Sequence, residues 1–182
     1  LAVFMGKVLK KKTAVAGDEV TYSLMLRQMQ KASAIQHKGI ASRHAYSMDG
    51  IDYYCGIRDE DIGILRQKYD VIILDISFEN TFDNTNVTFA RMVSRLSACD
   101  EKILAGSMLP WKSRECEKKM ERIERFLDIR GLKMVTLAAC DKEAVSIIKK
   151  HGVEVVLIPF ERNPFVISGE NLRSFLELLK IT

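Results

Sequence analysis

The stretch Tyr69-Asp70-Val71-Ile72-Ile73-Leu74-Asp75-Ile76-Ser77 decides the fold. Its centre is an unbroken apolar run rich in β-branched residues and bounded by charge, which predicts a fully buried strand. Such strands are typical of parallel sheets, because helices cover both faces of those sheets. Ligands of open α/β sheets bind beyond the carboxyl ends of the strands, so Asp75 is a candidate for chemistry. An acid that only caps the next loop is the alternative interpretation.

Composition limits the class of protein. A chain of 182 residues with 47% hydrophobic and 29% charged residues is large enough for one globular core. Its net charge of +4 is too small to indicate nucleic-acid binding. Four cysteines (Cys55, Cys99, Cys116 and Cys140) stand far apart without a Cys-x-x-Cys pair, which favours buried thiols in a reducing cytoplasm. No apolar run reaches membrane-spanning length, although peripheral contact with a membrane is not excluded.

Strand and helix patterns alternate along the whole chain. The apolar spacing of residues 1–9 predicts the last turns of a helix, and residues 32–49 predict a polar connection with one short strand. Further strands are expected at 13–17, 50–56, 101–107, 133–139 and 153–160, and helices after Asp18 and at 58–68, 87–96, 112–130, 144–151 and 169–180. This alternation predicts an α/β fold with a doubly wound, mostly parallel sheet and helices on both faces, a three-layer sandwich. We expect a single domain over residues 1–182, with Trp111 in its core rather than at a partner contact.

Five segments carry a resemblance to a known family. They are Gly50-Ile51-Asp52-Tyr53-Tyr54, the stretch 69–75, Ala98-Cys99-Asp100-Glu101-Lys102-Ile103-Leu104, Gly131-Leu132-Lys133-Met134-Val135 and Leu157-Ile158-Pro159-Phe160. In order and spacing they resemble P-loop ATPases of the MinD/ParA type, in the SIMIBI class. The divergent CpaE/TadZ-like branch of pilus assembly is the most similar in character.

The phosphate-binding loop of that family is missing from the sequence. No Gly-x-x-x-x-Gly-Lys-Ser/Thr motif occurs in the 182 residues, because Gly6-Lys7 is followed by valine and lacks the earlier glycine. In the family this loop holds the phosphates and magnesium. The helix-like start predicts that the first strand and its loop precede residue 1, and loss of the loop in this member is the alternative.

The resemblance implies a nucleotide site in the whole protein. Asp75 takes the place of the Walker-B-type aspartate, which binds Mg²⁺ through water and starts a switch loop that includes Ser77. Asp18 lies near the place of a second family acid. The segment that flanks adenine is matched by Pro159, Phe160 and Arg162. Two departures weaken hydrolysis: Ile76-Ser77-Phe78 replaces the family's Asp-x-x-Gly, and Asp141 stands near the place of an asparagine.

Two functions follow from the resemblance. The first is an ATP-driven switch that forms a homodimer over nucleotide and positions a partner machine in pilus or secretion assembly, partition or division. The second is a degenerate scaffold that only binds protein partners. We expect ATP and Mg²⁺ to bind the full-length protein, and neither to bind residues 1–182 alone.

A different class offers a rival interpretation. The stretch 69–75 also resembles the phosphoacceptor strand of response-regulator receivers, with Asp75 as the phosphoacceptor. Asp18 and Glu19 would then imitate the acidic turn, and Ser107 the switch hydroxyl. Receivers need paired acids for magnesium and a Lys-Pro after their fifth strand, and neither is clear here. We therefore favour the ATPase-like interpretation.

Overall fold

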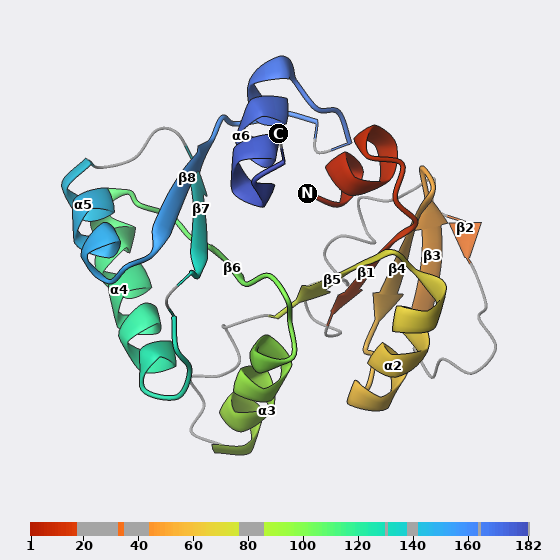
Figure 1. The fold of residues 1–182 in the computed structure, drawn as a ribbon, viewed down its shortest axis with the longest axis horizontal. Helices are drawn as coiled ribbons and strands as arrows, with labels where there is room; N and C mark the ends of the chain where they lie inside the picture. The colour runs from red at the N-terminus through yellow and green to blue at the C-terminus, as the bar shows by residue number, and fades with distance from the viewer. Residues whose placement is uncertain are drawn as a thin grey trace. The chain divides into compact units, whose positions relative to one another are not determined.

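A computed structural model describes residues 1–17, 33–34, 44–76, 86–129, 131–137, 142–163 and 165–181. The chain divides into two compact units, Leu1–Thr88 and Phe89–Thr182, each of which contains parallel strands and helices (Figure 1). The predicted α/β class is therefore confirmed. The single domain over residues 1–182 stays a prediction.

The first unit contains a five-stranded sheet in the order β2-β3-β4-β1-β5. Its strands are β1 (Thr13–Gly17), β2 (Ser33–Ala34), β3 (His44–Met48), β4 (Ile51–Cys55) and β5 (Val71–Asp75). Strand β1 pairs in parallel with β4 on one side and with β5 on the other. Strands β2 and β3 add an antiparallel margin, with β3 paired to β4. The sheet is mixed, and its parallel core is β4-β1-β5.

The tight turn between β3 and β4 corrects one expectation. Residues 32–49 contain two strands rather than one, and β3 forms a hairpin with β4. The turn residues Asp49 and Gly50 both have positive φ angles, 55° and 77°. Two-residue hairpin turns of this kind favour an Asp-Gly sequence. That dipeptide was the signal that the sequence offered for the hairpin.

Burial along the parallel core corrects a second expectation. Every residue of β1 is buried, because β1 has a strand on each side. Every residue of β5 is only partly buried, so the predicted fully buried strand is wrong. Strand β5 stands at the end of its sheet, with β1 as its paired neighbour in the described part of the chain.

Helices cover the first sheet. The N-terminal helix includes a π-helical stretch, η1 (Phe4–Val8), and its Phe4 is fully buried. Gly6 lies so close to the sheet that a Cβ there would stand 3.1 Å from Ile51 Cγ1. Helix α2 (Asp59–Lys68) places Leu65 on a core cluster with Ala14, Ala16, Tyr54, Ile57 and Tyr69. The expected helices at 1–9 and 58–68 are thus both present.

The second unit contains a parallel sheet in the order β6-β7-β8. Its strands are β6 (Ile103–Ala105), β7 (Lys133–Leu137) and β8 (Glu154–Ile158), and its helices are α3 (Asn86–Ser97), α4 (Pro110–Glu124), α5 (Lys142–Lys150) and α6 (Gly169–Leu179). Every strand and helix expected in this half is present, although α4 ends at Glu124 rather than near residue 130.

The core of the second unit depends on a close approach at Gly106. A Cβ at this position would stand 2.6 Å from Met134 Cε and 2.8 Å from Cys116 Sγ. Cys116, Met120 and Met134 are all buried, so the expected apolar stripe of α4 faces the sheet. A side chain at this position would force Met134 and Cys116 to shift from their places beneath this stripe.

Helix α6 begins and ends with well-formed caps. The Ser168 hydroxyl accepts a hydrogen bond from the Asn171 amide at 3.2 Å, and Lys180 ends the helix in a left-handed conformation with a φ of 53°. The expected apolar residues Leu172, Phe175, Leu176 and Leu179 are only partly buried, whereas Leu178 is buried. The predicted face is therefore offset from the face that packs most deeply.

Two expectations about individual side chains remain. Trp111 is 73% exposed, so its predicted place in the core is wrong. Cys55 and Cys116 are buried free thiols and Cys99 is partly buried, whereas Cys140 lies outside the described residues. Among the described helices, none is long and apolar enough to cross a membrane.

Candidate functional site

The carboxyl edge of the first sheet carries the main candidate residue. Strands β1, β4 and β5 run in parallel and end at this edge with Gly17, Cys55 and Asp75. Gly17 is the register partner of both Cys55 and Asp75. The Gly56 amide continues the ladder by donating to the Gly17 carbonyl at 2.9 Å. The Asp75 carboxylate therefore stands at a strand end of the kind at which ligands of α/β sheets bind.

Glycine shapes the backbone around Asp75. Gly17 has no side chain, so no Cβ of β1 stands beside the carboxylate at their shared level of the sheet. Gly56 turns the chain away from β4 with a φ of 65°, a conformation that glycine adopts at no steric cost. A ligand at this edge would thus meet main-chain groups of β1 and one acid of β5.

The residues expected to work with Asp75 fall in two places. Asp18, Ser77 and Asp141 lie outside the described residues. Pro159, Phe160 and Arg162 belong to the second unit, directly after β8. Pro159 is partly buried, whereas the Phe160 ring is 76% exposed and Arg162 is exposed. The structure thus describes Asp75 and this loop as parts of separate units.

The loop after β8 is tied to the start of α6. The Asn163 side-chain carbonyl accepts a hydrogen bond from the Phe165 amide at 3.0 Å. The Asn171 side-chain amide donates to Glu161 Oε2 at 3.4 Å. Asn171 is 3% exposed, and its Oδ1 has no hydrogen-bond partner among the described residues. Because this oxygen is closed off from the surface, the exposed candidate side chains of the loop are Phe160 and Arg162.

A chain of polar side chains inside the first unit was not expected from the sequence. The Tyr69 hydroxyl donates to Asp52 Oδ2 at 2.5 Å, and the Tyr54 and Tyr69 hydroxyl oxygens are 2.6 Å apart. Tyr54 is fully buried and Tyr69 is 7% exposed. Since Tyr69 gives its proton to Asp52, Tyr54 is the donor in the tyrosine pair. Asp52 and Tyr54 stand two residues apart on β4, and this alternation was the available sequence signal.

Protonation of the two tyrosines keeps this chain of donors intact. Burial is the main cause that raises the pKa of Tyr69, and its hydrogen bond to Asp52 raises it further. Burial also raises the pKa of Tyr54. Both hydroxyls therefore hold their protons at neutral pH, and the carboxylate of Asp52 terminates the chain.

The amino-terminal end of β5 is hydrogen-bonded to the segment before β1. The Lys12 amide donates to Asp70 Oδ2 at 2.9 Å, and the Lys12 carbonyl accepts from the amides of Asp70 and Val71 at 2.9 and 3.2 Å. The Lys12 ammonium lies over the Tyr69 ring, 5.2 Å from its centroid. These contacts gather at the amino-terminal end of β5, opposite to Asp75.

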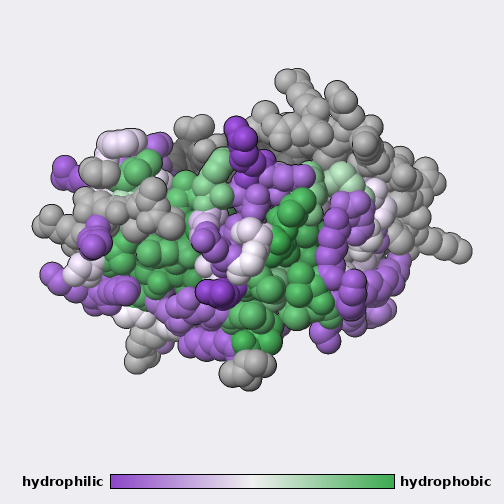
Figure 2. Space-filling model, turned by 90° about the horizontal axis from the view of Figure 1, so that it is seen from above, coloured by the Kyte–Doolittle hydropathy of each residue, from purple (hydrophilic) through white to green (hydrophobic). Residues whose placement is uncertain are grey.

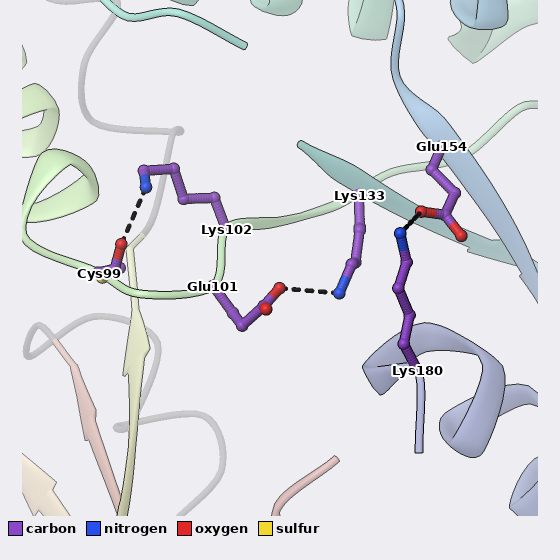
Figure 3. Close-up of polar contacts among 6 residues, drawn as sticks. All are labelled: Cys99, Glu101, Lys102, Lys133, Glu154 and Lys180. Carbon is purple, nitrogen blue, oxygen red and sulfur yellow. Dashed lines mark hydrogen bonds and ion pairs between the residues drawn. The ribbon is translucent and has the colours of Figure 1, made fainter. Parts of the chain in front are cut away.

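Several charged side chains of the second unit form contacts near the points where strands begin (Figure 3). Lys133, the first residue of β7, is 4% exposed, and its ammonium lies 2.8 Å from Glu101 Oε2. Lys180 pairs with Glu154, the first residue of β8, at 3.1 Å, and the Lys102 ammonium donates to the Cys99 carbonyl at 2.8 Å. Because ligands of parallel sheets bind at the opposite edge, we assign these pairs to stability.

Ser107, the hydroxyl of the rival interpretation, stands beyond β6 in the second unit. Its backbone carbonyl lies 3.6 Å from Cys116 Sγ, which donates to it. Burial raises the pKa of the Cys116 thiol, so the sulfur remains a protonated donor. The contact fixes the backbone of Ser107 next to α4 and does not engage its hydroxyl.

The donor set decides which metal suits the edge at Asp75. A carboxylate oxygen is a ligand that Mg²⁺ prefers, and Mg²⁺ usually keeps several waters and is held by one or two carboxylates plus phosphates. Within the described ranges there is no group of three or more His, Cys, Asp or Glu residues that could hold a metal ion. The residues present thus fit a water-mediated magnesium beside a phosphate.

Comparison with known proteins adds no assignment. No family model matches the chain, and no protein of curated function matches it by sequence.

Proposed function

We propose that this chain is part of a nucleotide-dependent switch of the MinD/ParA type, which works in the cytoplasm and positions a protein partner machine. The observation that carries the proposal is the place of Asp75, at the carboxyl end of β5 and in register with Gly17 of β1. The matching order of strands and helices along the chain supports it. The nucleotide in this proposal is ATP with Mg²⁺, and binding of nucleotide would favour a homodimer.

Asp75 would hold Mg²⁺ through water. When bound there, the metal would neutralise charge on the nucleotide phosphates. The carboxylate fixes the side of the sheet from which the metal is held, and the glycine at Gly17 leaves the neighbouring backbone accessible. Asp75 would then report the state of the nucleotide to the residues that follow it in the chain.

The unpaired side of β5 is compatible with a phosphate-binding strand beside it. For Mg²⁺ held by Asp75 through water to meet a phosphate as well, the phosphate loop would have to lie near the end of β5. Strand β1 occupies one side of β5, and the other side carries no paired strand among the described residues. A strand and loop from another segment of the protein would fit that side.

Weak hydrolysis distinguishes the switch from a fast enzyme. Ile76 directly follows Asp75 where the family has its Asp-x-x-Gly, so a glycine hinge is missing from the start of the switch segment. A protein that binds ATP and hydrolyses it slowly would act as a scaffold whose partner binding depends on nucleotide. The degenerate scaffold is therefore the limiting case of the same proposal.

Nucleotide titration tests the proposal. Labelled ATP is titrated, with and without Mg²⁺, into residues 1–182 and into the protein extended by the residues encoded upstream of Leu1. We expect Mg²⁺-dependent binding by the extended protein, lost in Asp75→Asn and retained in the matched control Asp59→Asn at the exposed start of α2. Tight binding by residues 1–182 alone, or equal binding by Asp75→Asn, would contradict the proposal.

A phosphoryl mimic separates the receiver class. Beryllofluoride with Mg²⁺ stabilises the phosphorylated form of a receiver through its phosphoacceptor aspartate. We expect no change in the amide spectrum of residues 1–182 when it is added without nucleotide. A response that Asp75→Asn abolishes would instead assign the chain to the receivers.

A further inference from the structure

Strand β5 is held less firmly along its length than the other parallel strands. All five of its residues are partly buried, whereas β1 is buried throughout and β4 at four of five positions. In the described part of the chain β5 pairs on one side alone, with β1. An edge strand with half-exposed side chains opens more readily than a central strand. The contacts at the start of β5 therefore bear on the position of Asp75, the last residue of the strand.

The amino-terminal end of β5 supplies that support through two residues. Asp70 forms a reciprocal pair of bonds with Lys12, whose amide donates to the Asp70 carboxylate and whose carbonyl accepts from the Asp70 amide. Tyr69 donates its hydroxyl proton to Asp52 on β4. Asp70 thus ties the start of β5 to the start of β1, and Tyr69 ties it to β4 on the far side of β1.

These bonds are strong in kind. Hydrogen bonds to a charged acceptor are shorter and stronger than those between neutral groups. Tyr69 is also packed edge-on against Tyr54, with ring centroids 6.1 Å apart and planes at 76°. Because the Tyr69 ring is buried and Tyr69 caps the end of α2 two residues before β5, it fixes the point at which the helix delivers the chain to the sheet.

We propose that Tyr69 and Asp70 are positioning residues for Asp75. They fix the start of β5 against Lys12 and Asp52, and the strand, which rises about 3.3 Å per residue, carries that fixed position to its other end. The proposal rests on the function proposed for Asp75, because positioning matters only if the carboxylate has a metal to meet. It adds that the binding geometry is set at the edge of the sheet opposite to the ligand.

Hydrogen exchange tests the support without any nucleotide. The variant Tyr69→Phe keeps the ring, its packing and the Lys12 contact but removes the hydroxyl. Tyr53→Phe is the matched control, because Tyr53 is 3% exposed and lies between Asp52 and Tyr54, on the other face of β4. We expect the amides of residues 72–75 to exchange on the order of tenfold faster in Tyr69→Phe than in Tyr53→Phe, as a lost bond to a charged acceptor implies. The amides of β4, whose Asp52 and Tyr54 also lose a side-chain partner, should accelerate less than those of β5.

A second variant keeps the test decisive if Tyr69→Phe folds poorly. Asp70 is exposed, so Asp70→Asn should fold while its weaker acceptor loosens the bond from the Lys12 amide. Faster exchange confined to β5 in this variant supports the proposal. Exchange at the wild-type rate, or equal acceleration in β4 and β5, would overturn it, since the second result indicates a general loss of stability.

Magnesium-dependent nucleotide binding then tests the functional part. In the extended protein, Tyr69→Phe should weaken ATP binding several-fold in the presence of Mg²⁺ and leave Mg²⁺-free binding unchanged. Asp75→Asn should abolish the Mg²⁺-dependent part while β5 exchanges at the wild-type rate. If the wild-type protein binds no ATP, the proposed function fails while the exchange result still decides whether Tyr69 holds β5. Unchanged Mg²⁺-dependent binding in a Tyr69→Phe protein with fast β5 exchange would overturn the positioning role.

Discussion

In the unit Leu1–Thr88 a chain of three polar side chains runs from the partly buried Asp52 through Tyr69 to the fully buried Tyr54, whereas the described ion pairs of Phe89–Thr182 lie along helices and where strands begin. The exposed large apolar side chains are divided unevenly between the two units. Among the described residues of the first unit, Val8 is the one exposed large hydrophobic side chain. The second unit exposes Trp111, Phe126, Leu137, Leu157, Phe160, Val166 and Ile181. Apolar residues reaching the surface among polar ones are visible in Figure 2.

The two units thus differ in what their polar contacts and exposed side chains do. In the first unit the hydrogen bonds of Tyr69 and Tyr54 hold the start of β5, the strand that ends at the candidate acid Asp75. A fully bonded buried network favours one arrangement, because each unmade bond inside a core is costly. The second unit exposes its candidate contacts, and Trp111 and Phe160 are its most exposed aromatic side chains among the described residues. We infer that the first unit sets geometry and that the second offers surface.

Core truncation gives the largest effect and tests whether the units are separate. Leu65 in α2 and Met120 in α4 are both fully buried. We expect Leu65→Ala and Met120→Ala each to lower the free energy of unfolding by about 2–5 kcal/mol. Leu65→Ala should speed amide exchange in β1 and spare β7, and Met120→Ala should do the reverse. Equal acceleration of both strands in both variants would break the comparison and indicate one cooperative domain over residues 1–182.

Alkaline pH should lower the stability of the first unit by a smaller amount, because the tyrosines of the chain all lie in that unit. All five tyrosines (Tyr22, Tyr46, Tyr53, Tyr54 and Tyr69) precede residue 89. Burial, followed by the charge of Asp49, raises the pKa of Tyr53 to about 12. The unfolded chain loses this proton near pH 10 and the folded chain near pH 12, so the stabilisation is complete below pH 10 and is lost as the pH rises towards 12.

The measurement is the denaturant midpoint of the first unit at pH 9, 10 and 11. Above pH 10 each such tyrosine should lower stability by about 1.4 kcal/mol per pH unit. Tyr53→Phe should reduce the slope of the first unit by this amount, leave the part that comes from Tyr54 and Tyr69, and leave the second unit unchanged. A wild-type slope in Tyr53→Phe would mean that Tyr53 ionises in the folded state as readily as in the unfolded chain.

The sequence predicted the order of elements because apolar periodicity is a local property. Residues 71–75 are a strand for reasons contained in their own side chains. Whether that strand is central or at an edge depends on which strands pair, and for this reason the full burial of β5 was predicted wrongly. The alternation of strand and helix carries no information on that pairing order.

The polar chain escaped prediction for a related reason. Asp52 and Tyr69 are 17 residues apart, and their contact exists only because α2 returns the chain to the start of β5. Each residue alone has an ordinary surface interpretation. Asp75, in contrast, was identified from the sequence because the rule that ligands bind at strand ends needs only the strand and its direction.

Trp111 gives the smallest expected effect and sharpens the contrast between core and surface. It follows Pro110 in the first turn of α4, where its side chain is 73% exposed. Trp111→Ser should change the free energy of unfolding by less than about 0.5 kcal/mol, as surface substitutions usually do. Its matched control is Phe126→Ser, because Phe126 is also exposed but packs edge-on against Phe89 at 5.1 Å. That variant should lose about 0.5–1.5 kcal/mol for the ring pair.

Thermal or denaturant unfolding of the two variants decides between surface and core for Trp111. A loss of several kcal/mol in Trp111→Ser would restore the core position that the sequence predicted and remove the largest residue from the exposed set. A neutral result leaves a large exposed aromatic side chain that the second unit does not need for its own stability. The comparison would then be sharper, because the residue could be changed freely in any experiment on partner binding without loss of the fold.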